Sequence, residues 1–192
     1  MPLYRPSLNT SFGRLVAGGG TVHGLVPGAA FIGTAGTRTL TANRAYYEQW
    51  IVETETTIDQ VYIEVTTLIN PSSIGIAIYN ATSDGQPSSL VLDCGTVDSS
   101  STGVKSITLG SPLVLPIGRY MVAFGSAAAP AVRVYRAAQP HLQLAMGATP
   151  VIQQLFVAGG YSGSWTNPGT AWTSIIGGSP EHAVIARASA VV

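Results

Sequence analysis

Alternation of apolar and polar residues is the dominant pattern along the middle and the end of the chain. It holds in five runs, which are residues 61–66, 74–79, 119–124, 132–135 and, more weakly, 182–188. The apolar members are mostly Val, Ile and aromatic residues. A two-residue period with this enrichment is typical of half-buried strands. The pattern therefore predicts a strand in each run.

Short polar breaks rich in Gly, Pro, Ser and Asp separate these runs. They fall at residues 70–73, 83–89, 98–103, 110–112, 116–118 and 127–130. Short strands divided by such turns are typical of antiparallel sandwiches and jelly rolls. We predict an all-β fold, an antiparallel β-sandwich of jelly-roll-like form, over residues 46–192. Residues 147–181 are expected to form a long loop region with two short apolar pieces.

Residues 1–45 differ from the rest because glycine interrupts every short apolar run in them. No period of 2 or 3.6 persists, so the segment has too little apolar surface to offset the entropy of its own ordering. We predict an extended N-terminal arm for attachment and oligomerisation, held in place by a partner subunit.

Composition adds that the surface carries little charge. Charged residues make up 9% of the 192 residues, against about 25% in ordinary soluble domains, and the net charge is zero. The hydrophobic fraction is 46% and the mean hydropathy is +0.32. A free monomer with this surface would be poorly protected against association, so we expect partners to cover part of it. No apolar stretch approaches the roughly 18 residues that cross a bilayer, so membrane insertion is not expected.

The few charges are segregated along the chain. Residues 1–45 carry four arginines and no acid, Arg5, Arg14, Arg38 and Arg44, whereas residues 46–98 carry eight acids and no base. Four arginines are too few for a nucleic-acid-binding arm. We interpret them as arm contacts to acidic protein surface, on the same chain or on a neighbour. Chance clustering is the alternative.

Two motifs lie within the predicted sandwich. The first is Ile78-Tyr79 followed by Asp84-Gly85-Gln86-Pro87, then Leu92 with Gly95-Thr96-Val97; the second is Leu115-Pro116-Ile117-Gly118-Arg119-Tyr120. Gly85 tolerates positive φ and Pro87 cannot donate to a ladder, so the first break predicts a turn between two strands.

Together these motifs resemble a β-sandwich module of tailed-bacteriophage structural proteins, over roughly residues 57–125. That module occurs in head fibre, decoration and tail fibre proteins. The resemblance implies a non-enzymatic virion protein, assembled in the bacterial cytoplasm and bound to capsid or tail proteins. It also implies a homo-oligomer, with a trimer favoured.

The sequence contains few signs of a catalytic or metal-binding site. His23, His141 and His182 lack a Gly-x-Ser-x-Gly frame or any visible base–nucleophile spacing. The acids Glu53, Glu55, Asp93 and Asp98 are not clustered with aromatic residues as a glycosidase cleft requires. Cys94 is alone and is interpreted as a buried apolar side chain. Asp84 or Asp98 could bind calcium together with loop carbonyls, but the sequence has no Asp-x-Asp run that would indicate such a site. We expect no enzyme activity, metal or cofactor.

Sugar binding is the alternative function. Tyr161, Trp165 and Trp172 lie in a Gly/Ser-rich region, where exposed rings could stack on pyranose faces of host polysaccharide. The competing interpretation, which the usual burial of Trp favours, is that these rings pack against the sandwich or a subunit interface. Trp50 is expected to pack.

Overall fold

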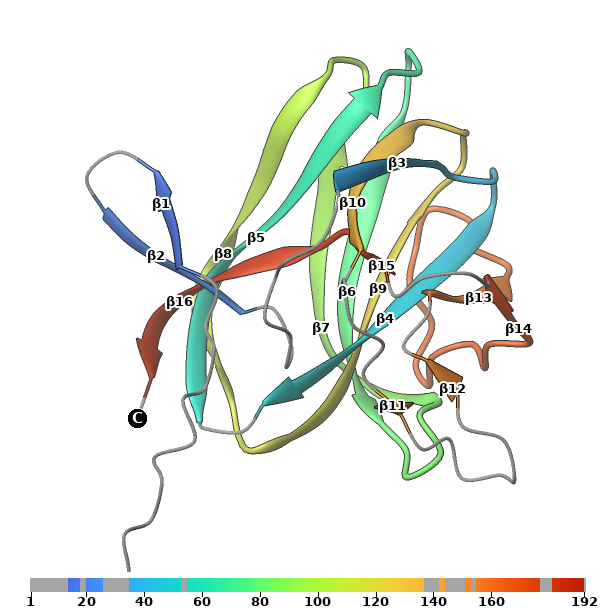
Figure 1. The fold of residues 1–192 in the computed structure, drawn as a ribbon. Helices are drawn as coiled ribbons and strands as arrows, with labels where there is room; N and C mark the ends of the chain where they lie inside the picture. Colours follow the sequence, from blue (N-terminus) through green and yellow to red (C-terminus); the bar gives the residue numbers. More distant parts are fainter. Residues whose placement is uncertain are drawn as a thin grey trace, which may run out of the picture.

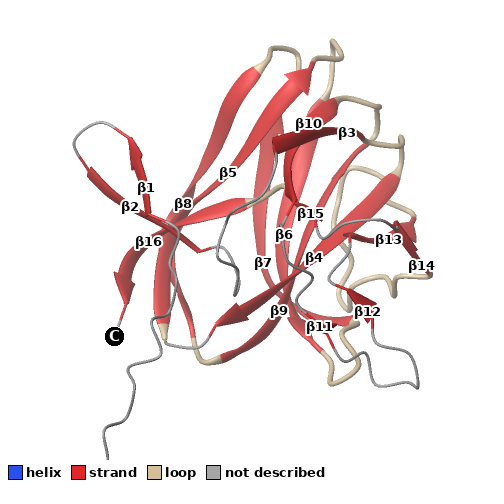
Figure 2. Cartoon of the chain, viewed as in Figure 1, coloured by secondary structure: helices blue, strands red, loops and turns tan. Residues whose placement is uncertain are grey.

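The computed structural model describes residues 14–17, 20–25, 35–52, 55–136, 142–143, 151–152, 155–176 and 181–191. These residues form strands joined by turns and loops, with no helix among them (Figure 2). Their strand pairs are antiparallel and build two sheets that share one core, so the predicted all-β sandwich is confirmed. Within these residues, no helix is long and apolar enough to cross a membrane.

The larger sheet, sheet A, has eight strands. They are β1 (Arg14–Ala17), β2 (Gly20–Leu25), β3 (Ala35–Thr39), β5 (Thr56–Thr67), β8 (Gly103–Leu115), β10 (Ala131–Arg136), β15 (Glu181–His182) and β16 (Ile185–Val191). β5 is central: it pairs with β8 along one side and with β16 and then β10 along the other (Figure 1).

The second sheet, sheet B, has six strands in the order β14-β13-β4-β9-β6-β7. They are β4 (Arg44–Val52), β6 (Ser73–Ala81), β7 (Pro87–Asp98), β9 (Gly118–Ser126), β13 (Leu155–Gly159) and β14 (Ser174–Ile176). β11 (Leu142–Gln143) and β12 (Val151–Ile152) form a separate two-stranded ribbon. Four of the predicted runs thus lie within β5, β6, β9 and β10, whereas the run 182–188 is divided between β15 and β16, with residues 183–184 outside both strands. The two apolar pieces of the 147–181 region contribute β12, β13 and β14.

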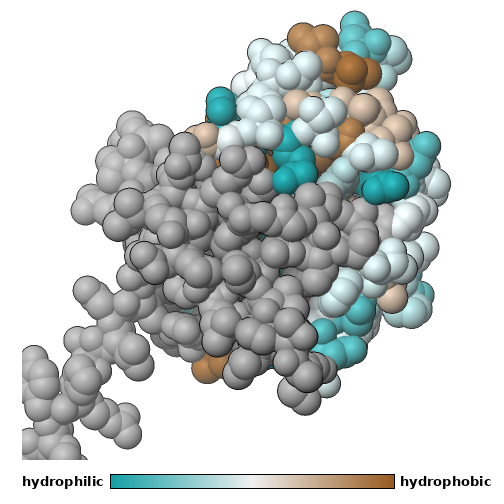
Figure 3. Space-filling view, turned by 45° about the vertical axis from the view of Figure 1, so that its right-hand side comes forward, coloured by the Kyte–Doolittle hydropathy of each residue, from teal (hydrophilic) through white to brown (hydrophobic). Residues whose placement is uncertain are grey.

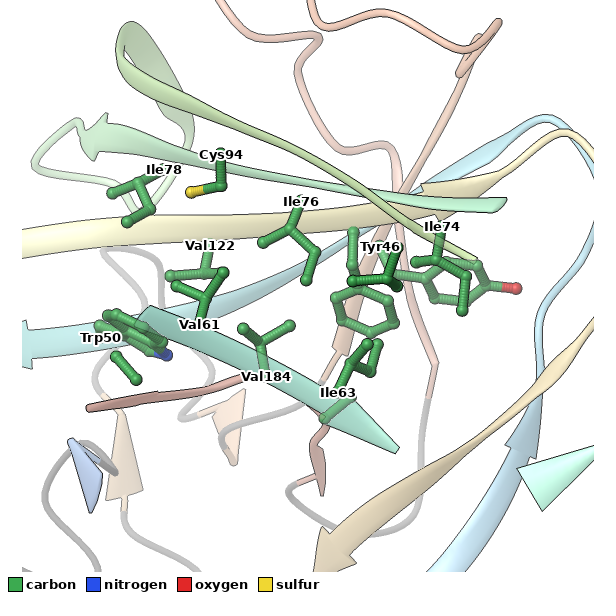
Figure 4. Close-up of a cluster of buried hydrophobic side chains, with 14 of the residues drawn as sticks. Tyr46, Trp50, Val61, Ile63, Ile74, Ile76, Ile78, Cys94, Val122 and Val184 are labelled. Atoms are coloured by element: carbon green, nitrogen blue, oxygen red, sulfur yellow. The ribbon is translucent and has the colours of Figure 1, made fainter. Parts of the chain in front are cut away.

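Alternation in the sequence becomes alternation between core and outer face. In β5, Val61, Ile63 and Val65 are buried between the sheets, whereas Tyr62 and Glu64 are half-buried on the outer face. Figure 4 shows Ile74, Ile76 and Ile78 of β6 facing Val61 and Ile63 across the core. Tyr46 stacks on Phe124 with ring centroids 5.5 Å apart. Trp50 is fully buried, as expected, and Cys94 is buried beside Ile78.

One predicted break is wrong. Residues 110–112 lie inside β8, where the ladder with β5 shifts register opposite Asp59. β8 pairs only with β5 among the described strands, so Pro112 has no second neighbour that needs its missing N–H. A Gly-Ser-Pro sequence can therefore bend an edge strand without ending it.

Described residues within the predicted arm are hydrogen-bonded into both sheets, with β1, β2 and β3 in sheet A and the first two residues of β4 in sheet B. β3 pairs with β10, and Leu40 just after it is buried in the core. β1 and β2 form a hairpin that lies along β16 (Figure 1). In the single chain, these strands are held by their own sandwich, whereas the sequence predicts a partner subunit as their support. The sandwich sheet extends into the range assigned to the arm because backbone pairing needs no apolar periodicity.

Candidate functional site

The outer face of sheet B carries an unusual apolar layer. Its members, contributed by β4, β6 and β9, are buried although they point away from the main core: Ala45, Tyr47, Ala77, Tyr79, Met121 and Ala123. Residues 159–173 cross this face and cover it, as Figure 1 shows beside β13 and β14. We call residues 159–173 the covering loop. It holds all three aromatic residues proposed as glycan contacts.

Tyr161 lies in a slot made by two glycines. Its ring crosses β6 and β9 at Gly75 and Gly125, and only 3% of the residue is exposed. A Cβ atom at Gly75 would lie 2.1 Å from Tyr161 Oη, and one at Gly125 would lie 2.9 Å from Tyr161 Cγ. Both positions must therefore lack a side chain. Burial raises the pKa of Tyr161, and the ring has no face open for stacking on a sugar.

Trp165 is half-buried and packs on two tyrosines. Its ring centroid lies 4.5 Å from that of Tyr161 and 6.5 Å from that of Tyr79, the latter edge to face. Its Nε1 is buried and makes no hydrogen bond to any described residue. Part of the ring is open to solvent, so Trp165 combines packing with a surface that a ligand can reach.

Trp172 is fastened to the Asp84–Pro87 turn. The Trp172 backbone N–H donates to Gln86 Oε1 at 3.0 Å, and the indole Nε1 donates to the Gly85 carbonyl at 2.9 Å. Gly85 has φ of 80°, which confirms the predicted turn. The turn is itself closed by Thr82, whose N–H donates to the Gln86 carbonyl at 2.9 Å. The motif thus supplies acceptors that hold the covering loop.

Further hydrogen bonds fix the loop between its tryptophans. Tyr79 Oη donates to the Thr166 carbonyl at 2.9 Å, and burial raises the Tyr79 pKa, so this phenol stays protonated. The Leu90 N–H donates to Asn167 Oδ1 at 3.1 Å, and the Gly169 N–H donates to the Ser88 carbonyl at 2.9 Å. The last two bonds cap the free edge of β7. The covering loop is therefore a fixed third layer over sheet B.

A hollow of about 210 Å³, including the open space at its mouth, remains beneath this loop. Its lining residues are Ala45, Tyr47, Gly159, Gly160, Tyr161, Ser164, Trp165, Thr166 and Thr170. Of these, Ser164, Thr166 and Thr170 are exposed hydroxyl residues around an aromatic floor. Its enclosed part is only about 10 Å³, which is room for about one water molecule and far less than the space of drug-sized sites. A bound group would therefore rest against the mouth of the hollow and not inside it.

Two of the four proposed arm arginines, Arg38 and Arg44, can be placed in the structure, and they lie on strands of different sheets. Arg5 lies outside the described residues, as does the side chain of Arg14 in β1. Arg38 is half-buried in β3, and Arg44 is exposed at the start of β4. The acids of β5 instead pair with the basic C-terminal part of the chain: Arg133 Nη2 lies 3.0 Å from Glu64 Oε1, and Arg187 Nη2 lies 2.5 Å from Asp59 Oδ2. Part of the charge segregation thus reflects neighbouring strands of sheet A.

A buried carboxyl group, Glu48, was not selected from the sequence. It is 1% exposed between the sheets, where it accepts hydrogen bonds from Trp50 Nε1 at 2.9 Å, Ala183 N at 2.8 Å and Val184 N at 3.3 Å. Burial raises its pKa to about 7, and the three N–H donors oppose that rise. Glu48 joins β4 to the segment before β16. Its inward place between Tyr46 and Trp50 was the signal available in the sequence.

Residues considered for catalysis and metal binding are scattered where they can be placed. His141, Glu53 and the side chains of His23 and His182 lie outside the described residues. Glu55, Asp84, Asp93 and Asp98 are exposed. Among the described residues, no group of three or more His, Cys, Asp or Glu is placed to hold a metal ion. Burial raises the pKa of the Cys94 thiol to about 12, which makes it a poor nucleophile.

Comparison of the chain with protein-family models, with curated proteins and with solved structures finds no match. The resemblance to phage structural modules therefore stays a prediction carried by its two motifs. In the structure the first motif forms the β6–β7 hairpin. The second forms the β8–β9 turn, where Tyr120 Oη donates to the Pro116 carbonyl at 2.9 Å. Both motifs shape turns.

Proposed function

We propose that the chain is a non-enzymatic structural protein of a tailed-bacteriophage particle, as a head decoration, fibre or tail component. The sandwich displays a weakly charged surface, and the N-terminal segment attaches it to sister subunits and to capsid or tail proteins. The proposal places the protein in the virion and favours a trimer, by analogy with the resembling modules.

The observation that carries the proposal is the way the N-terminal segment joins the sheet. The β1–β2 hairpin adds to the edge of β16 through backbone pairing, with Gly24 opposite Arg187. Adding a strand to a sheet edge is a general mode of protein–protein attachment, since main-chain hydrogen bonds supply affinity with little demand on side chains. A segment with this property suits assembly.

The two motifs support the same proposal. In the Asp84–Pro87 turn, Gln86 and Gly85 accept hydrogen bonds from the covering loop, and in the β8–β9 turn Tyr120 closes on Pro116. Their residues thus hold a rigid module together. A protein selected for display and assembly needs this rigidity more than it needs a reactive cleft.

The proposal is tested in the natural setting of the gene. Particles purified from cells that carry it are probed by mass spectrometry and by immunogold electron microscopy with an antibody against the sandwich. We expect the chain in the particle and label on its outer surface. Particles that form without the chain bound to them would overturn the proposal.

The role of the N-terminal segment is tested by deleting residues 1–34. The boundary precedes β3, because deletion through residue 45 would also remove a strand of sheet A and the buried Leu40. We expect the shortened protein to fold, with a β signal in circular dichroism that loses only the share of β1 and β2, and to be lost from particles. Normal incorporation of the folded, shortened protein would contradict an anchoring role.

A second candidate function, binding of host polysaccharide, is favoured by the hollow under the covering loop. Its aromatic floor includes Tyr47 and the partly open Trp165, and its rim carries hydroxyls of Ser164, Thr166 and Thr170. Burial raises the pKa of Tyr47 to about 12, so its phenol is protonated at neutral pH. Tyr161 and Trp172 would act indirectly, by holding the loop.

Glycan arrays followed by calorimetry test this second function. Ser164→Tyr would fill the hollow, and Ser162→Tyr is the matched control because Ser162 is exposed on the same loop and does not line the hollow. We expect a glycan bound by the control and by the unmodified protein to be lost with Ser164→Tyr. Equal binding by both variants, or no binding to any glycan, would dismiss the hollow as a sugar site.

A further inference from the structure

The N-terminal hairpin touches the rest of sheet A along one short ladder. β2 pairs with β16 at three positions, Leu25 with Ala186, Gly24 with Arg187 and His23 with Ala188. β1 pairs only with β2 among the described strands. Figure 1 shows the hairpin beside β16, on the side of the sandwich away from β13 and β14. The hairpin thus joins the sheet as a separate unit.

This unit depends on the edge of β16 for support. An isolated two-stranded hairpin is marginally stable in water, so β1 and β2 gain most of their order by adding to a larger sheet. The edge of β16 in turn gains a partner, since without β2 its outward backbone groups would be open to other chains. Hairpin and edge therefore stabilise each other.

Nothing in that ladder requires both strands to come from one chain. The connection between Leu25 and Ala35 has nine residues, which span at most about 30 Å when extended. It contains Pro27-Gly28 and Gly33. Exchange of an identical element between protomers keeps every native hydrogen bond and is a low-cost route to oligomers. The zero net charge of the chain adds little repulsion between copies.

We propose that the β1–β2 hairpin, residues 14–25, docks on β16 of a second copy of this chain in the assembled protein. The occupant of the β16 edge is then the neighbour's β2, in the same antiparallel register. This inference rests on the proposed assembly role of the N-terminal segment and identifies its partner as a sister subunit.

Mixed single-cysteine chains test the exchange directly. One chain carries Gly24→Cys and the other Arg187→Cys, with different affinity tags and with Cys94→Ser in both. A second set carries His23→Cys and Ala188→Cys, because neighbouring antiparallel pairs alternate in their suitability for a disulfide. The chains are unfolded, mixed, refolded and oxidised. We expect a disulfide-linked dimer that contains both tags in at least one set, in a yield that rises with protein concentration.

Two controls make the result decisive. A pair inside the body, Tyr62→Cys on one chain and Ser106→Cys on the other, should give no mixed dimer because β5 and β8 pair within each sandwich. Chains that carry both Gly24→Cys and Arg187→Cys, or both His23→Cys and Ala188→Cys, show whether the ladder closes within one chain. Cross-links found only inside chains would overturn the exchange, and so would the absence of any cross-link in both sets.

Failure of this inference is distinguishable from failure of the proposed function. If mixed dimers are absent while deletion of residues 1–34 still removes the protein from particles, the segment anchors the protein by another contact. Mixed dimers together with a particle that lacks the chain would support exchange and contradict the virion role.

Discussion

The outer faces of the two sheets are protected from solvent in different ways. On sheet A the outer face around β5 is polar: Asp59 and Glu64 of β5 pair with Arg187 and Arg133, and Gln60 Nε2 donates to Thr108 Oγ1 at 2.7 Å. On sheet B the outer face is apolar and lies beneath the aromatic side chains of residues 159–173.

The difference shows how a weakly charged chain covers a sandwich. With only 9% charged residues, it places four of them in two cross-strand ion pairs on one face and a Gly/Ser-rich loop over the other. On the side drawn in Figure 3, the described surface is mostly pale or teal, with brown residues gathered at its upper end. Stability should therefore depend strongly on the loop and weakly on the ion pairs.

The largest effect is expected from removal of the Tyr161 ring. Tyr161→Ala leaves the slot over Gly75 and Gly125 empty and should lower the free energy of unfolding by ~3–5 kcal/mol. Tyr161→Phe keeps the ring and should cost about 1 kcal/mol or less. Urea denaturation measures both. A small loss with Tyr161→Ala would mean that the covering loop is not part of the cooperative fold.

Glu48, which is buried between the two sheets, should make the free energy of unfolding depend on pH. Its pKa rises from 4.5 to about 7 on folding, so the native state binds the proton more tightly between these values. The Glu48 contribution to stability is then fully present below pH 4.5 and is lost as pH rises to 7, by an amount on the order of 3 kcal/mol. The pair Asp59–Arg187 has the opposite sign, because Arg187 lowers the Asp59 pKa and this contribution is lost as pH falls.

Glu48→Gln removes the titrating group. It also sets an amide NH₂ among three N–H donors and should cost ~1–3 kcal/mol at low pH. The histidines titrate in both proteins, so the difference in unfolding free energy between Glu48→Gln and the unmodified protein at each pH reports the titration of Glu48 alone. A constant difference from pH 4 to 8 would contradict the raised pKa.

Crowding of the Tyr161 slot should have an intermediate effect. Gly75→Ala places a methyl group against Tyr161 Oη and should cost ~1–3 kcal/mol as the ring moves. Gly110→Ala is the matched control, because Gly110 is also in a strand and a Cβ atom there meets nothing within 4 Å. Thermal unfolding compares the two. Equal melting temperatures would show that the Tyr161 ring can shift to make room for the methyl group without loss of stability.

The two tryptophans should separate hydrogen bonding from packing. Trp172→Phe loses the bond to the Gly85 carbonyl, whereas Trp165→Phe loses an N–H that has no partner among the described residues. We expect Trp172→Phe to cost about 1 kcal/mol more than Trp165→Phe. A reversed order in denaturant titrations would indicate that the Asp84–Pro87 turn does not anchor the loop.

The smallest effect belongs to the outer face of sheet A. A double-mutant cycle of Asp59→Ala and Arg187→Ala should give a coupling free energy of ~0–1 kcal/mol, since both side chains are partly open to solvent. The coupling should weaken at high salt. A salt-independent coupling free energy well above this range would contradict the weak contribution to stability that we expect from the ion pairs of sheet A.

Periodicity was sufficient for much of the fold. The runs 61–66, 74–79 and 119–124 became β5, β6 and β9 because an alternating segment can bury one face only as a strand. The break at residues 110–112 misled because Gly and Pro also occur at bulges on edge strands. β1, β2 and β3 were not predicted, since backbone pairing with β16 and β10 leaves no alternation to detect.

The residues proposed as glycan contacts also show what could not be predicted from the sequence. Composition located Tyr161, Trp165 and Trp172 in one loop, but it did not distinguish the buried ring from the partly open one. That distinction depends on Gly75 and Gly125, which lie far away in the sequence and form the slot only when β6 and β9 are paired.

By itself, the sequence determined that the protein is built of strands, where most of them turn, and that Asp84–Pro87 is a turn. These are local properties, set by side-chain period and by the φ preferences of Gly and Pro. Only the tertiary structure decided that this turn anchors Trp172, that Glu48 joins the two sheets, and that the acids of β5 meet the arginines of β10 and β16. Each of these contacts joins distant segments, and its energy arises only after burial has brought those segments together.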